Sequence, residues 1–315
     1  MHAIVFTGAG GREVMGLEER PDPVPGSNEV VVAASHAGLN PADLIQRAGH
    51  YPAPPGAVAD VPGLEVGGTV VATGDAVLGW QVGDRVFGIV GGGGLADRVA
   101  VHERHVARVP DRLSDEQAAA VPEAFITAHD AIFTRAGLVS GETLLVNGAN
   151  GGVGTAAVQL GLAAGARVLA NARDEPARER LAAMGADPVA LADVDGEADV
   201  VLELVGAPNL PGDLRALATW GRIIVVGTGA GAEFDMSLRA LMGKRASLMG
   251  TVLRARPMEE KGAAVQAFAR GVVPLLAEGR IAPPIDRVFA AADAADAFDH
   301  LASRGKFGKV LLQFA

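Results

Sequence analysis

An apolar, strand-like run that passes through a glycine-rich turn into a helix-like run constrains the fold of this chain more than any other feature. The strand-like run covers residues 144–147, the turn 148–154 and the helix-like segment 155–164. A second strand-like run, 168–172, follows at the spacing of a dinucleotide-binding unit. Strand, turn and helix in this order predict a binding site for a phosphate group.

The residue types in the turn suit that role. Glycine lets the backbone bend sharply and approach a pyrophosphate closely. The start of a helix directs free N–H groups and a partial positive charge toward an anion. We therefore predict that a dinucleotide binds to the backbone of Gly151, Gly152 and Val153; a tight turn without a ligand is the alternative.

Composition narrows the class of protein. The chain has 315 residues, enough for two domains with separate cores, and a formal net charge of −10, which argues against nucleic acid or an anionic membrane as the main partner. It has no cysteine, so disulfides, thiolate nucleophiles and Cys-ligated metals are excluded. Residues 1–6 lack the features of a signal peptide, and no apolar run approaches the ~20 residues of a membrane span. We expect a cytoplasmic protein that does not enter a membrane.

The pattern of strand-like and helix-like runs divides the chain into two parts. Residues 1–118 read as short strands broken by glycine and proline every ~8–12 residues, which is typical of a compact barrel-like domain. From 119 the pattern alternates between strands and helices, which predicts a parallel sheet. The final strand-like segment is expected to rejoin the first part. We therefore predict an α/β protein with a discontinuous β-rich domain, 1–118 and 260–315, and a dinucleotide-binding domain, 119–259.

Two local features carry further expectations. Only about six residues separate a possible third strand, 188–191, from the next strand at Asp199, whereas a helical crossover needs a dozen or more. We predict that the helix there is missing or reduced to a turn. The four-glycine run 91–94 is either a flexible hairpin tip or a mobile rim beside the substrate.

Several short motifs, in order along nearly the whole chain, suggest a family. They lie at 40–43 with Arg47, Gly49 and 51–52, and at 62–63, 65–66, 83–86, 149–154, 253–256 and 308–310. With these motifs the chain resembles the zinc-free, quinone oxidoreductase branch of the medium-chain dehydrogenase/reductase superfamily. The resemblance implies a GroES-like β-rich domain, a Rossmann doubly wound parallel sheet, NADPH as cofactor, and a homodimer or larger homo-oligomer.

The same resemblance bears on the metal. The zinc-using relatives place a Cys where Asn40 stands and a His where Leu64 stands, just before the matching Glu65. A catalytic zinc usually needs three protein ligands, so we expect no metal site. Without a Lewis acid, alcohol dehydrogenation is disfavoured. Quinones and conjugated enones fit better as acceptors, because their π systems spread the arriving charge onto a carbonyl oxygen.

The choice of nicotinamide cofactor rests on the end of the second strand. NAD enzymes usually carry an Asp or Glu there to bond the ribose 2′-OH, but Ala172 occupies the place. Arg173 and Arg178 follow, and a guanidinium can hold a 2′-phosphate through two contacts. We predict NADPH. In the alternative, Asp174 bonds the 2′-OH and Arg173 is an ordinary solvated charge.

The resemblance assigns the remaining site residues. The positions expected to contact the cofactor are Asn40, Thr127, Gly227, Thr228, Thr251 and Leu253. Asn40 and Tyr51 are expected to face the substrate, with Asn40 donating a hydrogen bond to the acceptor carbonyl as negative charge builds there. Asn40 could instead be only a helix cap, and Tyr51 only a loop packing residue. Asp43 and Arg47, four residues apart, predict a helical ion pair.

These observations favour an NADPH-dependent reductase that transfers a hydride to a quinone without a metal. A rival with the same fold reduces the C=C bond of an enone or an enoyl thioester. A rival of another class is a non-catalytic NADPH-binding sensor or structural protein. Retained Asn40 and Tyr51 beside an intact glycine turn argue against that last reading.

Overall fold

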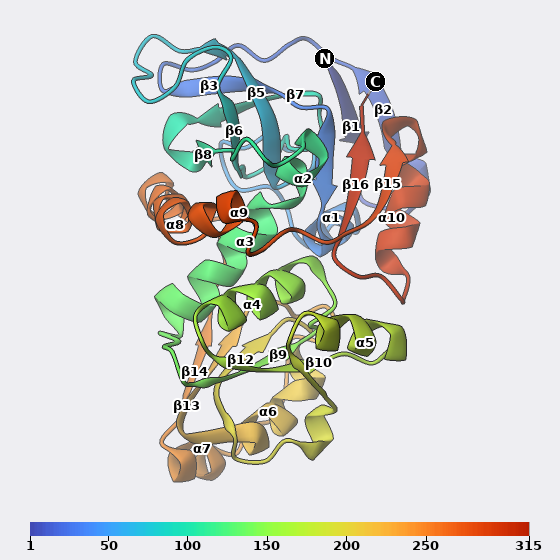
Figure 1. Ribbon diagram of the computed structural model, residues 1–315. Coiled ribbons are helices and arrows are strands. Elements are labelled where there is room, and N and C mark those ends of the chain that lie inside the picture. Colours follow the sequence, from blue (N-terminus) through green and yellow to red (C-terminus); the bar gives the residue numbers. More distant parts are fainter. Residues whose placement is uncertain (315) are drawn as a thin grey trace. The chain divides into compact units, whose positions relative to one another are not determined.

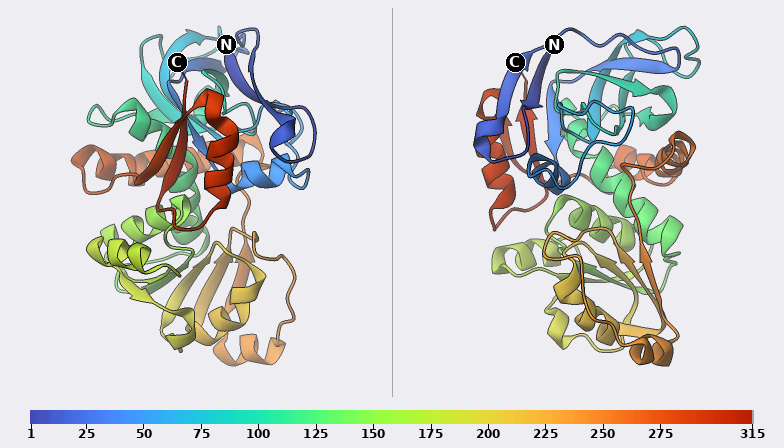
Figure 2. Two further views of the ribbon diagram at one scale, coloured as in Figure 1. Left: turned by 90° about the vertical axis from the view of Figure 1, so that its right-hand side faces the viewer. Right: turned by 180° about the vertical axis from the view of Figure 1, so that it is seen from behind.

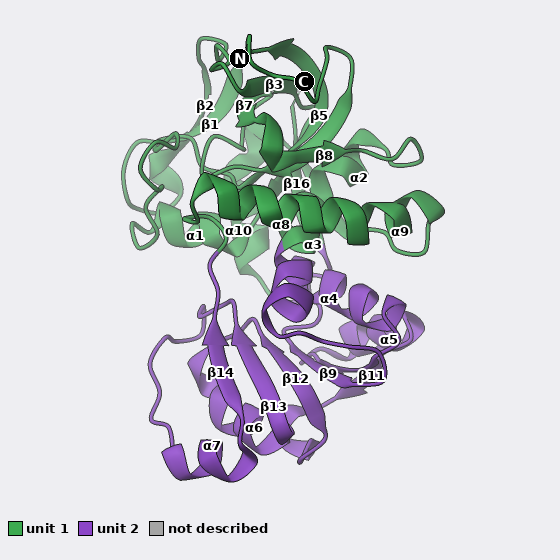
Figure 3. Ribbon diagram, turned by 90° about the vertical axis from the view of Figure 1, so that its left-hand side faces the viewer, with its two compact units in different colours: residues 1–126, 253–304, 309–315 green, residues 127–252, 305–308 purple. Residues whose placement is uncertain are grey.

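The computed structural model describes residues 1–314 and divides into two compact units. Unit 1 consists of Met1–Ile126, Leu253–Arg304 and Lys309–Ala315, and unit 2 of Thr127–Val252 and Gly305–Gly308 (Figure 3). Residues 119–126 and 253–259, predicted to lie in the dinucleotide-binding domain, thus group with unit 1. The boundary between Ile126 and Thr127 falls within the continuous helix α3 (Pro122–His129).

Unit 2 is built on a six-stranded parallel sheet in the order β11-β10-β9-β12-β13-β14. The strands are β9 (Thr143–Asn147), β10 (Arg167–Asn171), β11 (Asp187–Val189), β12 (Ala198–Glu203), β13 (Leu217–Val225) and β14 (Ser247–Gly250). Counted along the chain this order is 3-2-1-4-5-6, the doubly wound arrangement that the alternating pattern predicted.

Helices cover both faces of this sheet. The helices of unit 2 are α4 (Gly152–Ala163), α5 (Glu175–Ala183), α6 (Leu210–Ala216) and α7 (Leu238–Lys244). In Figure 1, α4 and α5 lie over one face and α6 and α7 over the other. Both faces of the central strands are therefore apolar, and Leu144, Leu145 and Val146 of β9 are fully buried.

The connection between β11 and β12 confirms the prediction of a missing helix. Only a single 3-10 turn, Leu191–Asp193, lies between the two strands. Its Leu191 packs against the core cluster beneath the sheet, which also contains Leu210 and Leu214 of α6. A neighbouring helix thus helps to cover the sheet where a crossover helix would otherwise lie.

Unit 1 contains a five-stranded antiparallel sheet, a three-stranded sheet and a two-stranded sheet. The strands are β1 (His2–Phe6), β2 (Met15–Glu19), β3 (Glu29–Ala33), β4 (His36–Leu39), β5 (Glu65–Thr73), β6 (Arg85–Ile89), β7 (Arg98–His102), β8 (Val106–Arg108), β15 (Ile285–Ala290) and β16 (Lys309–Gln313). The other helices are α1 (Pro41–Arg47), α2 (Asp115–Ala120), α8 (Met258–Gly271), α9 (Val273–Glu278) and α10 (Ala294–Ala302). The short helical segments are Arg12–Val14, Glu103–His105, Asp130–Arg135, Ala207–Asn209 and Ala291–Asp293.

The C-terminal strand completes the β-rich unit. β16 pairs in parallel with β15 and antiparallel with β4, so chain segments from both ends of the sequence share one sheet. Phe298 of α10 packs beneath this sheet against Phe6 of β1, with ring centroids 5.8 Å apart. The left view of Figure 2 shows α10 beside β15 and β16.

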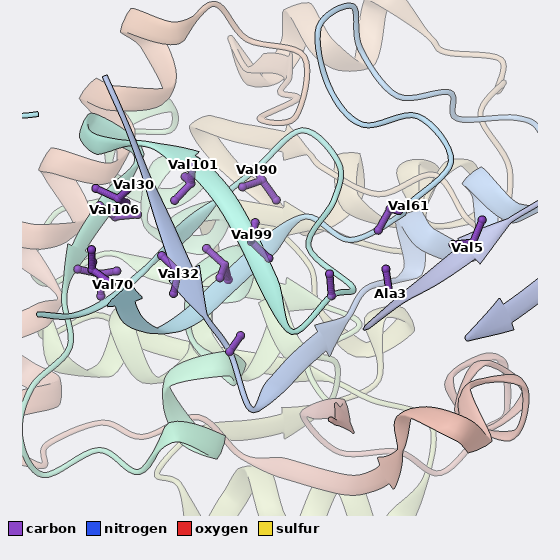
Figure 4. Close-up of a cluster of buried hydrophobic side chains, with 14 residues drawn as sticks. Ala3, Val5, Val30, Val32, Val61, Val70, Val90, Val99, Val101 and Val106 are labelled. Carbon is purple, nitrogen blue, oxygen red and sulfur yellow. The ribbon is translucent and has the colours of Figure 1, made fainter. Parts of the chain in front are cut away.

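The core of the five-stranded sheet is rich in valine. Val30, Val32, Val70, Val99 and Val101 are all buried there (Figure 4). β-branched side chains suit the pleated surface of a sheet, and this use of valine explains how a chain with only 4% aromatic residues still fills a core. Within residues 1–314, no helix combines the length and the apolar character that crossing a bilayer would require.

Candidate functional site

The glycine-rich turn follows β9 as the sequence predicted, and its geometry requires glycine. Gly148 has φ of +73°, in the left-handed region that favours glycine. A Cβ at Gly154 would lie 2.3 Å from the Gly148 carbonyl oxygen and 2.7 Å from the Ala149 backbone. The backbone conformation thus favours glycine at position 148, and close packing against the turn excludes a side chain at position 154.

The N-terminus of α4 has neither a side-chain cap nor an acidic side chain. Gly151 is the N-cap, it supplies no side-chain cap, and the first turn of the helix contains no acidic residue. The Gly151 N–H itself donates to the Gly148 oxygen at 3.2 Å, so it is committed within the turn. The N–H groups of Gly152 and Val153 open the helix, where no earlier carbonyl of the helix can accept from them. The fit to a pyrophosphate therefore rests on these two residues more than on Gly151.

The segment 305–308 lies against the same turn. The Gly308 N–H donates to the Asn150 oxygen at 2.8 Å, and the Asn150 amide donates to the Lys306 oxygen at 2.9 Å. Phe307 is buried under the Arg180 guanidinium of α5, which lies 3.8 Å from the ring centroid. These contacts hold the segment 305–308 against the glycine-rich turn within unit 2.

A buried polar network lies where the parallel strands end. The register places Asn147 of β9 beside Asn171 of β10 and Glu203 of β12. The Asn147 amide donates to Glu203 Oε2 and to Asp213 Oδ1, at 2.6 Å in each case. The Asn171 amide in turn donates to Asn147 Oδ1 at 2.8 Å. This network was not predicted from the sequence, because Asp213 is on α6 and lies 66 residues from Asn147 in the chain.

The two carboxyl groups of this network share a site without solvent. Both side chains are 0% exposed. Glu203 Oε1 accepts hydrogen bonds from the backbone N–H groups of Val205 and Gly206, at 2.5 and 2.6 Å. Burial, together with the neighbouring Glu203, raises the pKa of Asp213 to about 8. At neutral pH Asp213 is therefore the protonated partner of the pair.

The predicted 2′-phosphate residues lie together at the end of β10. Ala172 is buried and Arg173 is exposed. The Arg178 Nε donates to the Ala172 oxygen at 2.8 Å, so its guanidinium is held at the strand end. Asp174 is the N-cap of α5 and provides no side-chain cap. The structure thus brings Arg173 and Arg178 to the same strand end, together with the alternative Asp174.

The other predicted cofactor residues are divided between the units. Gly227 and Thr228 follow β13 and pack against the turn after β12, where a Cβ on Gly227 would lie 2.3 Å from the Leu204 oxygen. Thr251 follows β14 and donates its N–H to the Val225 oxygen at 3.0 Å. Thr127 is buried on α3, and Leu253 is buried at the start of the second segment of unit 1.

In unit 1, Asn40 belongs to a buried charged cluster. Lys309 Nζ donates to Asn40 Oδ1 at 2.7 Å and to Glu65 Oε1 at 2.6 Å. The Asn40 amide also donates to Glu65 Oε1, at 2.8 Å. Glu65 Oε2 accepts from the Glu123 N–H at the start of α3, at 2.9 Å. Lys309 lies in one of the family motifs, but its partner is 244 residues away in the chain, and sequence reasoning gave it no role.

Asn40 is also the N-cap of α1. Its backbone N–H donates to Asp43 Oδ2 at 2.8 Å, and Asp43 Oδ1 accepts from the Gly63 N–H at 3.1 Å. Burial raises the pKa of Asp43 to about 6. The predicted Asp43–Arg47 ion pair was therefore wrong: Asp43 turns inward to the cap and the loop, while Arg47 lies over the Phe298 ring.

Tyr51 lies in the long loop after α1. Its ring is stacked with the Arg254 guanidinium, whose Cζ is 4.9 Å from the ring centroid. Burial raises the pKa of the Tyr51 phenol, and the positive charge of Arg254 partly offsets that effect. Neither Arg254 nor its contacts were anticipated, although 253–256 is one of the family motifs.

The glycine run 91–94 packs against this loop instead of forming an exposed tip. Gly92 and Gly94 are buried. A Cβ on Gly92 would lie 2.3 Å from the Val58 oxygen, and one on Gly94 would lie 2.6 Å from the Glu65 oxygen. Glycine is needed here because two backbone segments meet at close range.

Comparison with known proteins now identifies the family. A family model described as alcohol dehydrogenase GroES-like domain matches residues 26–111, and one described as zinc-binding dehydrogenase matches 168–312. The mouse (Mus musculus) protein named quinone oxidoreductase is 32% identical, over 99% of this chain and 97% of its own. The chain belongs to the medium-chain dehydrogenase/reductase superfamily, in its quinone oxidoreductase branch.

Solved structures agree with this family. A structure described as an NAD-dependent alcohol dehydrogenase is 30% identical, with a TM-score of 0.87 and complete coverage of both chains. Escherichia coli quinone oxidoreductase complexed with NADPH has a TM-score of 0.88 over 99% of this chain and 100% of that one; at 24% identity it supports the fold alone. The antiparallel sheet of unit 1 is thus GroES-like and the parallel sheet of unit 2 is Rossmann-like. Fold and relatives together support a nicotinamide-dependent oxidoreductase with a small-molecule substrate.

Proposed function

We propose that this protein is an NADPH-dependent reductase that transfers a hydride to a quinone without a metal ion. One observation carries the metal-free part of the proposal. The Lys309 ammonium lies between Asn40 Oδ1 and Glu65 Oε1, at 2.7 and 2.6 Å. It supplies a fixed positive charge at the position where the zinc-using relatives gather ligands.

The donor set at this position does not suit zinc. Leu64 is apolar and buried, and the oxygens of Asn40 and Glu65 are already bonded to an ammonium. A zinc ion placed there would be repelled by Lys309 and would lack the nitrogen and sulfur ligands that it prefers. No group of three or more potential ligands occurs among the His, Asp and Glu residues of the described chain.

The residues of unit 2 suit a dinucleotide. The N–H groups of Gly152 and Val153 would hold the pyrophosphate at the positive end of α4. Arg173 and Arg178 would pair with a 2′-phosphate at the end of β10, which is the reason to propose NADPH over NADH. Thr127, Gly227, Thr228 and Thr251 would contact the nicotinamide end. The bound cofactor would supply the hydride.

The residues of unit 1 would orient the acceptor and stabilise its charge. One N–H of Asn40 is used by Glu65, and the amide reaches the Gly38 oxygen only at 3.5 Å, a long distance for a hydrogen bond. We propose that this second N–H turns to the acceptor carbonyl. Because Lys309 bonds the oxygen of the same amide, it polarises the group and strengthens the N–H donor. Tyr51 would pack against the flat ring of the acceptor.

The proton that completes the reduction would come from solvent. The phenol of Tyr51 has a raised pKa and is a poor acid. Asp43, with a pKa of about 6, is wholly buried and bonded to two backbone N–H groups. Neither group is suited to deliver a proton rapidly, whereas a hydroquinone anion can take one from water.

A panel of acceptors tests the proposal. NADPH oxidation is followed with naphthoquinones, simple enones and an enoyl thioester, and NADH is run in parallel. We expect turnover with quinones and a preference for NADPH. Turnover confined to enones or the thioester would transfer the assignment to a double-bond reductase. Tight NADPH binding without reduction of any acceptor would favour the sensor or structural protein.

We also propose that the protein forms a homodimer. β14 is an edge strand of the parallel sheet, and exposed apolar side chains lie near it: Trp220 is 66% and Met242 73% exposed. An open edge beside such side chains is suited to pairing with a second copy. Sedimentation velocity should give a dimer or a larger homo-oligomer, and Met242→Glu should shift it toward monomer. A wild-type monomer at micromolar concentration would refute this part.

A further inference from the structure

Arg254 is a buried cation that is held by neutral hydrogen-bond acceptors. The residue is only 5% exposed, and each of the three guanidinium nitrogens donates a hydrogen bond. Nε donates to the Gly91 oxygen at 2.8 Å, Nη1 to the Tyr51 oxygen at 3.0 Å, and Nη2 to Gln46 Oε1 at 2.6 Å. All three acceptors are neutral, and Asp43 and Glu123 add electrostatic attraction to the guanidinium.

These acceptors belong to separate segments around one loop. The chain runs from 48 to 64 without helix or strand, an unusual length for a loop in a compact domain. Arg254 attaches the start of this loop at Tyr51 to the Gly91 segment and to α1. Gln46 holds a later part of the same loop against α1, because its Nε2 donates to the Ala59 oxygen at 3.2 Å. The helix that Arg254 contacts through Gln46 is the one capped by Asn40.

The ring of Tyr51 is held as well as its backbone. With Cζ 4.9 Å from the ring centroid, the guanidinium occupies one side of the ring in a cation–π contact. Glu123 is the other charged group with an electrostatic effect on the phenol, and its effect is opposite to that of Arg254. One side chain thus sets the loop position, the ring orientation and part of the local potential.

We infer that Arg254 is the positioning residue for Tyr51: it fixes the ring relative to α1 and so determines how a flat acceptor is held. Only the part of this inference that concerns the acceptor rests on the proposed function. The link between Arg254 and Tyr51 does not depend on which substrate is reduced. A guanidinium fork makes three directed bonds and a flat stacking surface, and lysine cannot reproduce that combination.

The chain offers a direct readout, because Tyr51 is its single tyrosine. Protein labelled with ring-13C tyrosine should give one set of NMR signals, shifted from the random-coil position. We expect Arg254→Met to move these signals toward random coil and to narrow them, and Arg254→Lys to have an intermediate effect. Arg287→Met is the matched control, since Arg287 also stacks on a ring of unit 1, Phe289 at 4.7 Å, far from Tyr51 in the sequence.

Kinetics separate positioning from general stability. Measured on the folded fraction, Arg254→Met should raise the KM for a naphthoquinone about tenfold, with little change in the KM for NADPH. A loss confined to melting temperature, with unchanged KM, would overturn the inference. In a Tyr51→Ala background the same substitution should cost little more, because a residue that acts through Tyr51 gives non-additive effects. Full additivity would also overturn it.

The inference and the proposed function fail in different ways. If wild-type protein reduces no quinone but Arg254→Met still releases the Tyr51 signals, the proposed function is wrong and the positioning link stands. If quinone turnover is normal and Arg254→Met leaves both the signals and the KM unchanged, the inference alone is wrong.

Discussion

Lys309 and Arg254 are both buried cations of unit 1, but they are held in different ways. Lys309 is paired with the carboxylate of Glu65 at 2.6 Å, whereas Arg254 is bonded to neutral oxygens. Breaking a buried ion pair leaves the remaining charge uncompensated and is costly. A substitution at Glu65 or Lys309 is therefore expected to act first on stability, and one at Arg254 first on the loop that carries Tyr51.

Exchanging the charge of Arg173 should reverse the cofactor preference. Arg173 is exposed at the end of β10 beside Arg178, so Arg173→Glu is expected to leave folding intact and to repel a 2′-phosphate. We expect the KM for NADPH to rise about tenfold or more, with the KM for NADH almost unchanged. Steady-state kinetics with both cofactors checks this. Arg239→Glu, on the exposed surface of α7, is the control; an equal loss with both variants would contradict the assignment of Arg173.

Removal of the Tyr51 hydroxyl should have little effect on turnover. Tyr51→Phe keeps the ring and its contact with Arg254 but removes the only phenol of the chain. If solvent supplies the proton, turnover with a quinone and binding of NADPH both persist. Loss of most turnover with normal NADPH binding would mean that the phenol is the proton donor.

At the scale of elements, the first turn of α4 depends on the absence of a side chain. A Cβ at position 154 would lie 2.3 Å from the Gly148 oxygen, so Gly154→Ala must displace the turn. We expect NADPH affinity to fall by about tenfold or more, measured by isothermal titration calorimetry, because the pyrophosphate contacts lose their geometry. Gly243→Ala in α7 has open space around the added methyl and serves as the control. Equal affinity in both variants would argue against pyrophosphate binding at this turn.

The buried carboxyl groups of Glu203 on β12 and Asp213 on α6 should make the stability of the protein depend on pH. Asp213 has a pKa of about 8 in the folded protein against an ordinary value of 3.8, so between these values the folded state holds one more proton than the unfolded chain. The free energy of unfolding therefore falls as pH rises through this range, and the full loss is reached above pH 8. Asp213→Asn keeps a neutral group in the network and removes this loss.

We expect Asp213→Asn to raise Tm at pH 8 by on the order of 5 °C and to give no advantage near pH 4. Thermal melts at several pH values measure the difference. Asp195→Asn, at an exposed position of the same unit, should leave the pH dependence unchanged. An identical pH profile for wild type and Asp213→Asn would show that Asp213 is not protonated in the folded protein.

At the scale of the whole molecule, the sequence predicted the parts of the fold that local patterns encode. Strand β9, the turn and α4 were recognisable because an apolar run, glycines and a helical run are adjacent in the chain. The missing helix before β12 followed from the length of a connection. Contacts between distant segments were invisible: Lys309 with Glu65, Asp213 with Asn147, and Arg254 with Tyr51 each join residues that only the tertiary structure brings together.

For the candidate site, sequence reasoning predicted roles for residues but not the contacts that hold those residues in place. Asn40 was expected to be either a donor to substrate or a helix cap, and the structure gives it the cap together with a bond to Lys309. Its role toward an acceptor stays a prediction. The backbone N–H of Gly151 is used within the turn, which a list of glycines could not reveal.

The central claim is that NADPH reduces a quinone here without a metal, and one measurement tests it most directly. Purified protein is dialysed exhaustively against a chelator, its metal content is determined by mass spectrometry, and NADPH oxidation is followed with a naphthoquinone. We predict that the metal-depleted protein keeps its full kcat/KM and that added zinc has no stimulating effect. Loss of activity on depletion, with recovery when zinc is restored, would contradict the claim.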